Sequence, residues 1–220
     1  MNSTAQRRRA VTALKRDLIL AAARAVFEAE GLEGASLRAI AARAGYTPAA
    51  LYFHFESKEA IYAEVLQDSL ARLGAAVDDA LAAAPAEDPA ARLRAAAMAF
   101  FAFYADHPRD LDLGFYLFRG GMKSAGLGRQ RDTSLNAALE AALRPIAEEA
   151  EALGASRAEA SRIMVDCFAH AAGLLLLAHT GRIRMFGASA AGLMADHVEH
   201  QLARLSDMTR QVIGSGRPAS

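Results

Sequence analysis

The 220-residue sequence contains one cysteine, no tryptophan, few prolines and no excess of charge of either sign. Because Cys167 has no partner for a disulfide within the chain, we expect a reducing cytoplasm rather than secretion. The longest uninterrupted apolar run, 95–105, is well short of the roughly 18 residues that span a bilayer. We therefore expect a cytoplasmic protein with no membrane-spanning segment. The arginines at residues 7–9 are not followed by the apolar stretch of a secretion signal.

Alanine is the most abundant residue, with 54 copies, and it supplies nearly half of the apolar side chains. It is also the strongest helix former and the smallest side chain that still carries a methyl group. Few β-branched runs are present, and no segment alternates convincingly between apolar and polar positions. The composition therefore predicts an all-α protein built from closely packed helices.

The first 58 residues contain the pattern of a helix-turn-helix. After a polar arm that extends to about residue 11, apolar residues at helical spacing predict a first helix that ends at Gly31. Ser36 is a predicted N-cap of a short second helix, which Gly45 ends after about two turns. Thr47 and Pro48 then open a third helix, with threonine as the cap and proline in the first turn. Two short helices joined by a turn of about three residues are typical of the helix-turn-helix.

The rest of the chain predicts longer helices and one glycine-rich loop at about 120–128. The helices are expected at about 59–84, 90–106, from 108 to beyond 118, 130–153, 156–180 and 189–212.

The neutral net charge hides two oppositely charged regions. Residues 1–58 hold 9 lysines and arginines against 5 acidic residues, whereas residues 59–220 hold 16 against 20. A basic region that coincides with a helix-turn-helix is the electrostatic pattern of a DNA-binding protein, because lysine and arginine contacts with phosphate drive the association. The local charge therefore supports double-stranded DNA as a partner, which the overall charge does not.

Residues 18–66 carry an ordered set of short motifs whose spacing is distinctive. They resemble the DNA-binding domain of the TetR family of bacterial transcriptional regulators, and the final motif, Leu-Tyr-x-His-Phe followed by x-Ser-Lys-Glu, is the most characteristic. The motifs are Ser36-Leu37-Arg38-Ala39-Ile40-Ala41, Ala44-Gly45-Tyr46-Thr47, Leu51-Tyr52-Phe53-His54-Phe55 and Ser57-Lys58-Glu59.

The resemblance implies a homodimeric, ligand-responsive transcription factor, most often a repressor released from a palindromic operator. It implies nine or ten helices, of which the first three bind DNA and the last two form a four-helix bundle with the partner copy. Residues 1–58 then form the DNA-binding domain with its basic arm, and residues 59–220 form the effector-binding and dimerisation domain. Neither a cofactor nor an enzymatic activity is implied, and the sequence lacks the Gly-x-Ser-x-Gly and phosphate-loop motifs of common enzymes.

The matching positions identify candidate DNA contacts. Those expected at backbone phosphates are Ser36, Thr47, Tyr52, His54 and Lys58; those expected at bases are Pro48, Ala49, Ala50 and Phe53.

Many relatives have polar residues at the base-reading positions, whereas proline and alanine offer only apolar contacts, for instance to thymine methyl groups. Arg38, Arg43 and Tyr46 are candidates to compensate, and the arginines at 7–9 are candidates for a flanking minor groove. The alternatives are a solvated helix surface for Arg38 and Arg43, and disorder for the arm.

Seven of the fifteen aromatic residues lie between Phe100 and Phe118, on segments that line the effector pocket in this family. Ordinary core packing is the alternative for each residue taken singly. Apolar cavities with a few polar groups are typical small-molecule sites, so we expect a small hydrophobic effector. The candidate effector contacts are Phe101, Tyr104, Phe115, Phe118, Arg119 and His170.

The last two predicted helices combine small residues with leucines, which favours a dimer interface of closely approaching helices. A metal site is a weaker alternative, suggested by His197 and His200 with four other residues nearby, His170, His179, Asp166 and Cys167. Two other functions remain open for the chain: a helical small-molecule carrier that no longer binds DNA, and a purely structural dimerisation module.

Overall fold

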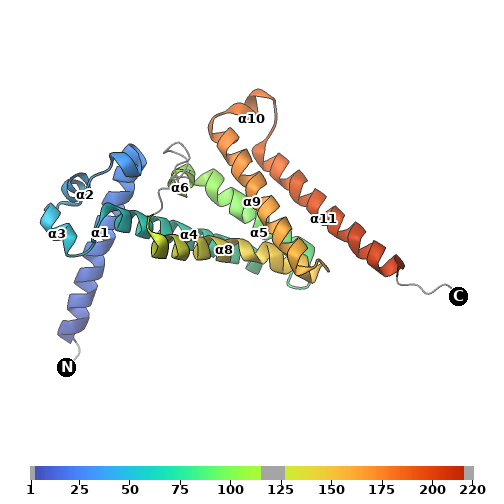
Figure 1. Cartoon of the computed structure of the whole chain (residues 1–220), viewed down its shortest axis with the longest axis horizontal. Helices are drawn as coiled ribbons and strands as arrows, with labels where there is room; N and C mark the ends of the chain where they lie inside the picture. Colours follow the sequence, from blue (N-terminus) through green and yellow to red (C-terminus); the bar gives the residue numbers. More distant parts are fainter. Residues whose placement is uncertain (1–2, 115–126, 216–220) are drawn as a thin grey trace. The chain divides into compact units, whose positions relative to one another are not determined.

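The computed structural model describes residues 3–114 and 127–215, with side chains from residue 6 to residue 207, and every regular element in these ranges is a helix (Figure 1). This confirms the all-α prediction. The helices are α1 (Ser3–Gly34), α2 (Leu37–Ala44), α3 (Pro48–Tyr52), α4 (Lys58–Ala83), α5 (Pro89–Asp106), α6 (Pro108–Gly114), α8 (Arg129–Ala152), α9 (Arg157–His179), α10 (Arg182–Met185) and α11 (Ala190–Ser215). The short α10 is absent from the sequence prediction.

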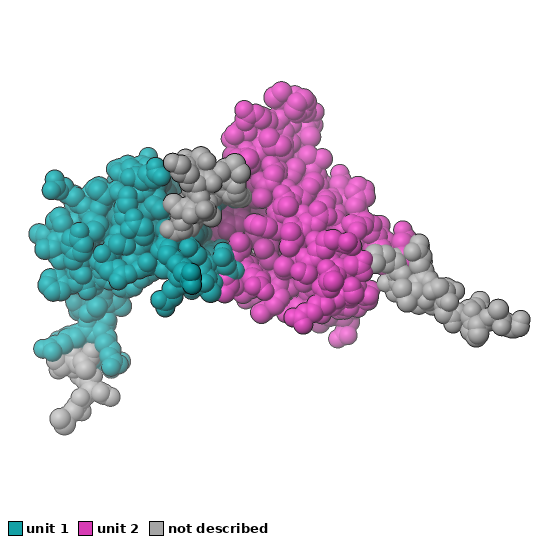
Figure 2. Space-filling view, in the orientation of Figure 1, with its two compact units in different colours: residues 1–70, 109–136 teal, residues 71–108, 137–220 magenta. Residues whose placement is uncertain are grey.

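The chain forms two compact units, which Figure 2 shows in different colours. Unit 1 comprises residues 1–70 and 109–136, and unit 2 comprises residues 71–108 and 137–220. The predicted functional boundary between residues 58 and 59 falls inside unit 1, at the start of α4. The first turns of α4 and the short α6 therefore pack with the three N-terminal helices.

The helix-turn-helix of unit 1 is held by local capping. The Ser36 Oγ accepts a hydrogen bond from the Ala39 N–H (3.1 Å), and the Thr47 Oγ1 accepts one from the Ala50 N–H (3.3 Å). Gly45 lies between α2 and α3 with φ at 74°, in the left-handed region that glycine adopts without strain. These caps confirm the predicted boundaries of both short helices.

A continuous apolar core lies beneath these caps. Ile40 and Leu51 are fully buried on α2 and α3, and the ring of Phe27 on α1 meets the ring of Tyr62 on α4 edge-to-face, with centroids 4.8 Å apart. The inner faces of α2 and α3 are therefore anchored in the core, and their outer faces point to solvent.

The first helix starts earlier than the sequence predicted. It begins at Ser3 instead of near residue 11, so the predicted polar arm is helical. The reason lies in its composition, because alanine, glutamine and arginine are good helix formers and no proline or glycine interrupts residues 5–30. Gly31, with φ at 70°, marks a kink before the end of α1.

Unit 2 is built around α5, α9 and α11, which pack against one another. By length and composition α9 is apolar enough to cross a membrane, a property that the search for uninterrupted apolar runs missed. Its Ile163, Cys167, Ala171 and Leu175 are buried, and one such helix is weak evidence for a membrane span. Arg92 of α5 forms an ion pair with Glu149 of α8.

Candidate nucleic-acid interface

The structure brings most of the predicted DNA-contacting residues to the surface of α2, α3 and the turn that follows. The exposed residues are Ser36, Arg38, Thr47, Pro48, Ala49 and Tyr52, and the half-buried ones are Ala50, His54 and Lys58.

The outward face of α3 is unusually apolar. Pro48, Ala49, Tyr52 and Phe53 lie at positions i, i+1, i+4 and i+5, opposite the buried Leu51. Phe53 is 90% exposed and Tyr52 is 61% exposed, so two aromatic rings stand in solvent at one end of a five-residue helix. The Tyr52 hydroxyl is the one side-chain hydrogen-bonding group on this face.

The capping hydroxyls keep a donor available. The oxygens of Ser36 and Thr47 accept backbone N–H groups, and a hydroxyl that accepts a hydrogen bond still has its own hydrogen to donate. Both residues are exposed. Each hydroxyl can therefore cap the start of its helix and at the same time donate a hydrogen bond to an anion.

Lys58 donates hydrogen bonds to the backbone that the sequence did not predict. Its Nζ donates to the carbonyl oxygens of Leu32 (2.8 Å), Glu33 (3.3 Å) and Ala35 (3.2 Å), where α1 ends. An ammonium group has three donors, and a cation at a helix C-terminus stabilises the unpaired carbonyls there. A direct bond from Lys58 to phosphate would require one of these hydrogen bonds to break.

Arg16 of α1 lies against the turn after α3. Its guanidinium is 4.5 Å from the centre of the Phe55 ring, forms an ion pair with Glu64, and donates to the His54 carbonyl oxygen (3.4 Å). The sequence analysis missed this residue, because nothing local in the sequence relates position 16 to positions 54–64.

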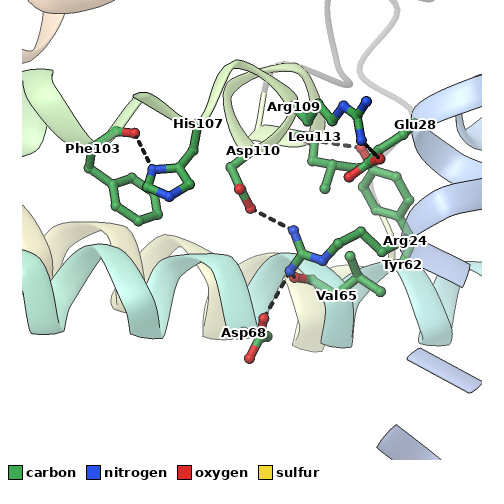
Figure 3. A network of polar contacts seen from close by, with 10 residues as sticks. All are labelled: Arg24, Glu28, Tyr62, Val65, Asp68, Phe103, His107, Arg109, Asp110 and Leu113. Atoms are coloured by element: carbon green, nitrogen blue, oxygen red, sulfur yellow. Dashed lines mark hydrogen bonds and ion pairs between the residues drawn. The ribbon is translucent and has the colours of Figure 1, made fainter. Parts of the chain in front are cut away.

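A second set of polar contacts joins α6 to α1 and α4 within unit 1 (Figure 3). The Arg24 guanidinium on α1 donates to the Asp110 carboxylate on α6 (2.6 Å) and to the Asp68 carboxylate on α4 (2.8 Å). It also reaches the Val65 carbonyl oxygen (3.3 Å). Asp110 is only 5% exposed, so this ion pair lies in a poorly solvated position.

Two further bonds support the same attachment. The buried Tyr62 hydroxyl donates to the Leu113 carbonyl oxygen (2.7 Å), and Arg109 forms an ion pair with Glu28 of α1 (3.1 Å). All these contacts lie at or next to α6, which immediately precedes the segment that contains Phe115, Phe118 and Arg119. A displacement of α6 would therefore act directly on α1 and α4.

The predicted effector residues are only partly placed. Phe101 and Tyr104 are buried on α5, where the neighbouring Phe100 contacts Tyr104 (centroids 5.3 Å apart) and Phe168 of α9 (5.7 Å). His170 is half-buried on α9, with its ring stacked on that of His197 at 4.0 Å. Phe115, Phe118 and Arg119 lie outside the described residues.

The outer surface of α9 and α11 exposes apolar side chains beside small residues. Val165 and Leu176 of α9 and Leu193 of α11 are exposed, and Ala169 and Gly173 lie between them on α9. Residues spaced three or four apart on a helix share one face, so the exposed positions of α9 form a continuous stripe.

The metal alternative gains no support: among the described residues no group of three or more histidine, cysteine or acidic side chains is arranged to hold a metal ion. Burial raises the pKa of the Cys167 thiol to about 12, so this residue remains an inert, buried thiol.

Comparisons with known proteins agree with this arrangement. Residues 19–65 match the family model of bacterial regulatory proteins of the tetR family. The HTH-type transcriptional activator FasR of Mycolicibacterium smegmatis is 42% identical over 89 residues, a match that spans 40% of this chain and 40% of that protein.

Solved structures match over most of the chain. A protein of unknown function from Rhodococcus sp. RHA1 is 28% identical, with a TM-score of 0.67 over 85% of this chain and 93% of that one. A TetR-like transcriptional regulator from the same organism is 24% identical, with a TM-score of 0.63 over 87% of this chain and 97% of that one. At 24% identity, the likeness to the second structure shows the fold alone.

Proposed function

This chain belongs to the TetR family of bacterial regulatory proteins, and on that premise we propose that it is a cytoplasmic, homodimeric regulator of transcription. It binds a palindromic DNA operator through α2 and α3 and leaves it when a small hydrophobic effector binds. The observation that carries the proposal is the outward face of α3, which is anchored by Leu51 and exposes Tyr52 and Phe53 to solvent. No catalysis and no cofactor are needed for this function.

In the proposed complex the polar groups around α3 fix its position on the DNA. The hydroxyls of Ser36, Thr47 and Tyr52 donate to backbone phosphates, and His54 and Arg38 lie within the same surface. Lys58 acts mainly by holding the end of α1 in place and adds its charge to the local potential. Pro48, Ala49 and Ala50 face the bases. The two α3 helices of a dimer enter successive major grooves about 34–36 Å apart.

The dimer forms through α9 and α11. A charge-poor stripe that includes Val165, Ala169, Gly173 and Leu176 provides apolar area and allows close helix approach. A symmetric partner places the same stripe opposite itself, as a twofold interface requires.

Effector binding is proposed to act through α6. The candidate effector contacts in unit 2 are Phe101, Tyr104 and His170. The other candidates, Phe115, Phe118 and Arg119, lie outside the described residues and follow α6 in the sequence. Because α6 is bonded to α1 and α4 through Asp110 and Leu113, a shift of α6 changes the placement of the DNA-binding helices. The ligand need only bind the conformation that does not fit DNA more tightly than the one that does.

Repression is the proposed outcome of operator binding, since a dimer seated on a promoter excludes the transcription machinery. Activation is the second candidate, because the relative that is 42% identical over 89 residues is a transcriptional activator. A reporter gene driven by the operator distinguishes the two: deleting this protein raises expression if it represses and lowers expression if it activates.

DNA binding itself is tested by selecting duplexes from a random library with the full-length chain and measuring affinity in a mobility-shift assay. We expect a palindromic consensus. Tyr52→Phe, which removes an exposed hydroxyl and leaves the ring, should weaken binding about tenfold on all sequences, the usual worth of a hydrogen bond to a charged group. Recovery of no preferred duplex at low salt would overturn the proposal and favour a carrier or a dimerisation module.

A further inference from the structure

The N-terminal half of α1 leaves the body of unit 1 without any packing partner. Ile19 is the first buried side chain of the chain's described part, and the side chains at 6–18 are all exposed except that of the half-buried Arg16. At 1.5 Å per residue, residues 3–18 form a rod of about 24 Å. Figure 1 shows this part of α1 extending past α2 and α3.

This extension is strongly basic. Residues 6–18 carry Arg7, Arg8, Arg9, Lys15 and Arg16 against a single acidic residue. Arg16 is paired with Glu64, whereas the other four cations form no ion pair within the described residues. Four exposed cations on three turns of helix create a local potential that favours a polyanion.

The contacts of Arg16 place the extension relative to the recognition helix. Because Arg16 donates to the His54 carbonyl oxygen, α1 passes the turn that follows α3. Arg9 precedes Arg16 by seven residues, so it lies about 10 Å further along the rod. The cations are thus continuous with the proposed DNA surface and lie beyond its edge.

The helical form of this segment corrects the sequence-based expectation for the arginines. A helix with its side chains is about 10–12 Å wide, whereas the minor groove of B-DNA is about 6 Å wide. Insertion of a flexible arm into the groove therefore does not fit the structure, and neither does disorder. Contact with the phosphates that border the groove does fit, because long arginine side chains reach them from outside.

We infer that the N-terminal half of α1 is a second DNA-contacting surface, which grips backbone phosphates flanking each operator half-site. The inference rests on the proposed function. A second copy of this chain is a poorer occupant, since it would bring four cations against four. Val11, Leu14 and Leu18 remain exposed along the rod, so it gains little stability from the chain itself, and phosphate contacts fix it in place.

The test compares the full-length chain with the variant Arg7→Ala/Arg8→Ala/Arg9→Ala on the selected operator. One duplex ends at the half-sites, and a second extends about ten base pairs beyond each end. The wild-type protein should gain at least tenfold in affinity from the extension at about 0.1 M salt, and the variant should gain almost nothing. The slope of log affinity against log salt should be shallower in the variant by about 0.9 for each phosphate that it no longer neutralises.

A matched control removes the same charge elsewhere. Arg129→Ala/Arg144→Ala/Arg157→Ala alters three exposed arginines outside α1 and should retain the full gain from the longer duplex. If the wild type and the α1 variant bind the operator with the same salt slope and the same gain, the inference fails while the proposed function stands. A gain that depends on whether the flanks are A·T-rich or G·C-rich would also overturn it, because phosphate contacts carry no base information. If the wild type binds no operator, the proposed function fails first.

Discussion

Helix α3 and the pair α9 and α11 both place large apolar side chains in solvent, yet their surroundings differ. Phe53 and Tyr52 stand at the end of a helix of 5 residues, next to hydroxyl groups and the basic α1. Val165 and Leu176 lie along a helix of 23 residues, among alanine and glycine. The short, cation-flanked surface suits a polyanion with apolar groups in its groove, and the long, small-residue surface suits another helix. Charge and length together, rather than exposed apolar area alone, distinguish the two partners.

The largest expected effect comes from placing a charge on the α9 surface. Leu176→Glu should raise the dissociation constant of the dimer by about 100-fold or more, because each subunit then buries an unpaired carboxylate. Sedimentation velocity over a range of concentrations measures the change. Leu14→Glu is the matched control, since Leu14 on α1 is 60% exposed and Leu176 is 65% exposed. Equal effects of the two substitutions would remove the distinction between the surfaces.

The next effect concerns the attachment of α6. Arg24→Leu should destabilise the protein by about 3 kcal/mol, because the nearly inaccessible Asp110 carboxylate loses its ion pair with the Arg24 guanidinium. Asp110→Asn should cost clearly less, since Arg24 retains the exposed Asp68. Urea unfolding of both variants provides the comparison. If Asp110→Asn destabilises the protein as much as Arg24→Leu or more, the burial of the Asp110 charge does not explain the loss of stability.

How much of this was predictable differs between the two regions. The caps at Ser36 and Thr47 and the turn at Gly45 are local, so the sequence was sufficient to predict them. The contact between Arg24 and Asp110 spans 86 positions, and neither residue belongs to a local motif. The hydrogen bonds of Lys58 could not be predicted for the same reason, because its three carbonyl partners lie at and just after the end of α1.

A smaller effect tests the apolar reading face of α3. Replacing thymine by uracil in the operator removes only the methyl group, and we expect about a fourfold loss per contacted methyl, from about 0.8 kcal/mol for each buried carbon. Phe53→Ala should reduce this discrimination. Fluorescence anisotropy with the four combinations of protein and DNA measures it. If the replacement of thymine by uracil lowers the affinity equally for the wild type and for Phe53→Ala, Phe53 does not contact the thymine methyl group.

The smallest effect is a pH dependence in the α9 and α11 region. Burial lowers the pKa of His197 below its ordinary value of 6.5, and the positive charges of neighbouring groups act in the same direction. The folded state then binds a proton less tightly than the unfolded state. The contribution of His197 to the free energy of unfolding is therefore fully present above pH 6.5 and is lost as the pH drops below that value. The groups around His197 are His170, Asp166, His200, Gln201 and Arg204.

Thermal unfolding of wild type and His197→Gln between pH 5 and pH 8 tests this dependence. The variant should show a shallower fall at low pH, whereas His200→Gln, at an exposed neighbouring position, should retain most of the wild-type slope. If the stability of the His197 variant falls with pH as steeply as that of the wild type, other groups cause the pH dependence. Because the effect belongs to unit 2, it should leave the salt dependence of DNA binding unchanged.

The sequence by itself determined the helical fold, the helix-turn-helix with its caps, and the segregation of charge, because these depend on neighbours within a few positions. Only the tertiary structure decided that the basic N-terminus is a helix that extends beyond the core. It also decided that Lys58 and Arg24 hold other helices in place, and that α6 packs with the DNA-binding helices. The physical reason is that a charged side chain finds its partner through space. Burial and distance set the strength of that pairing, and neither is encoded in local spacing.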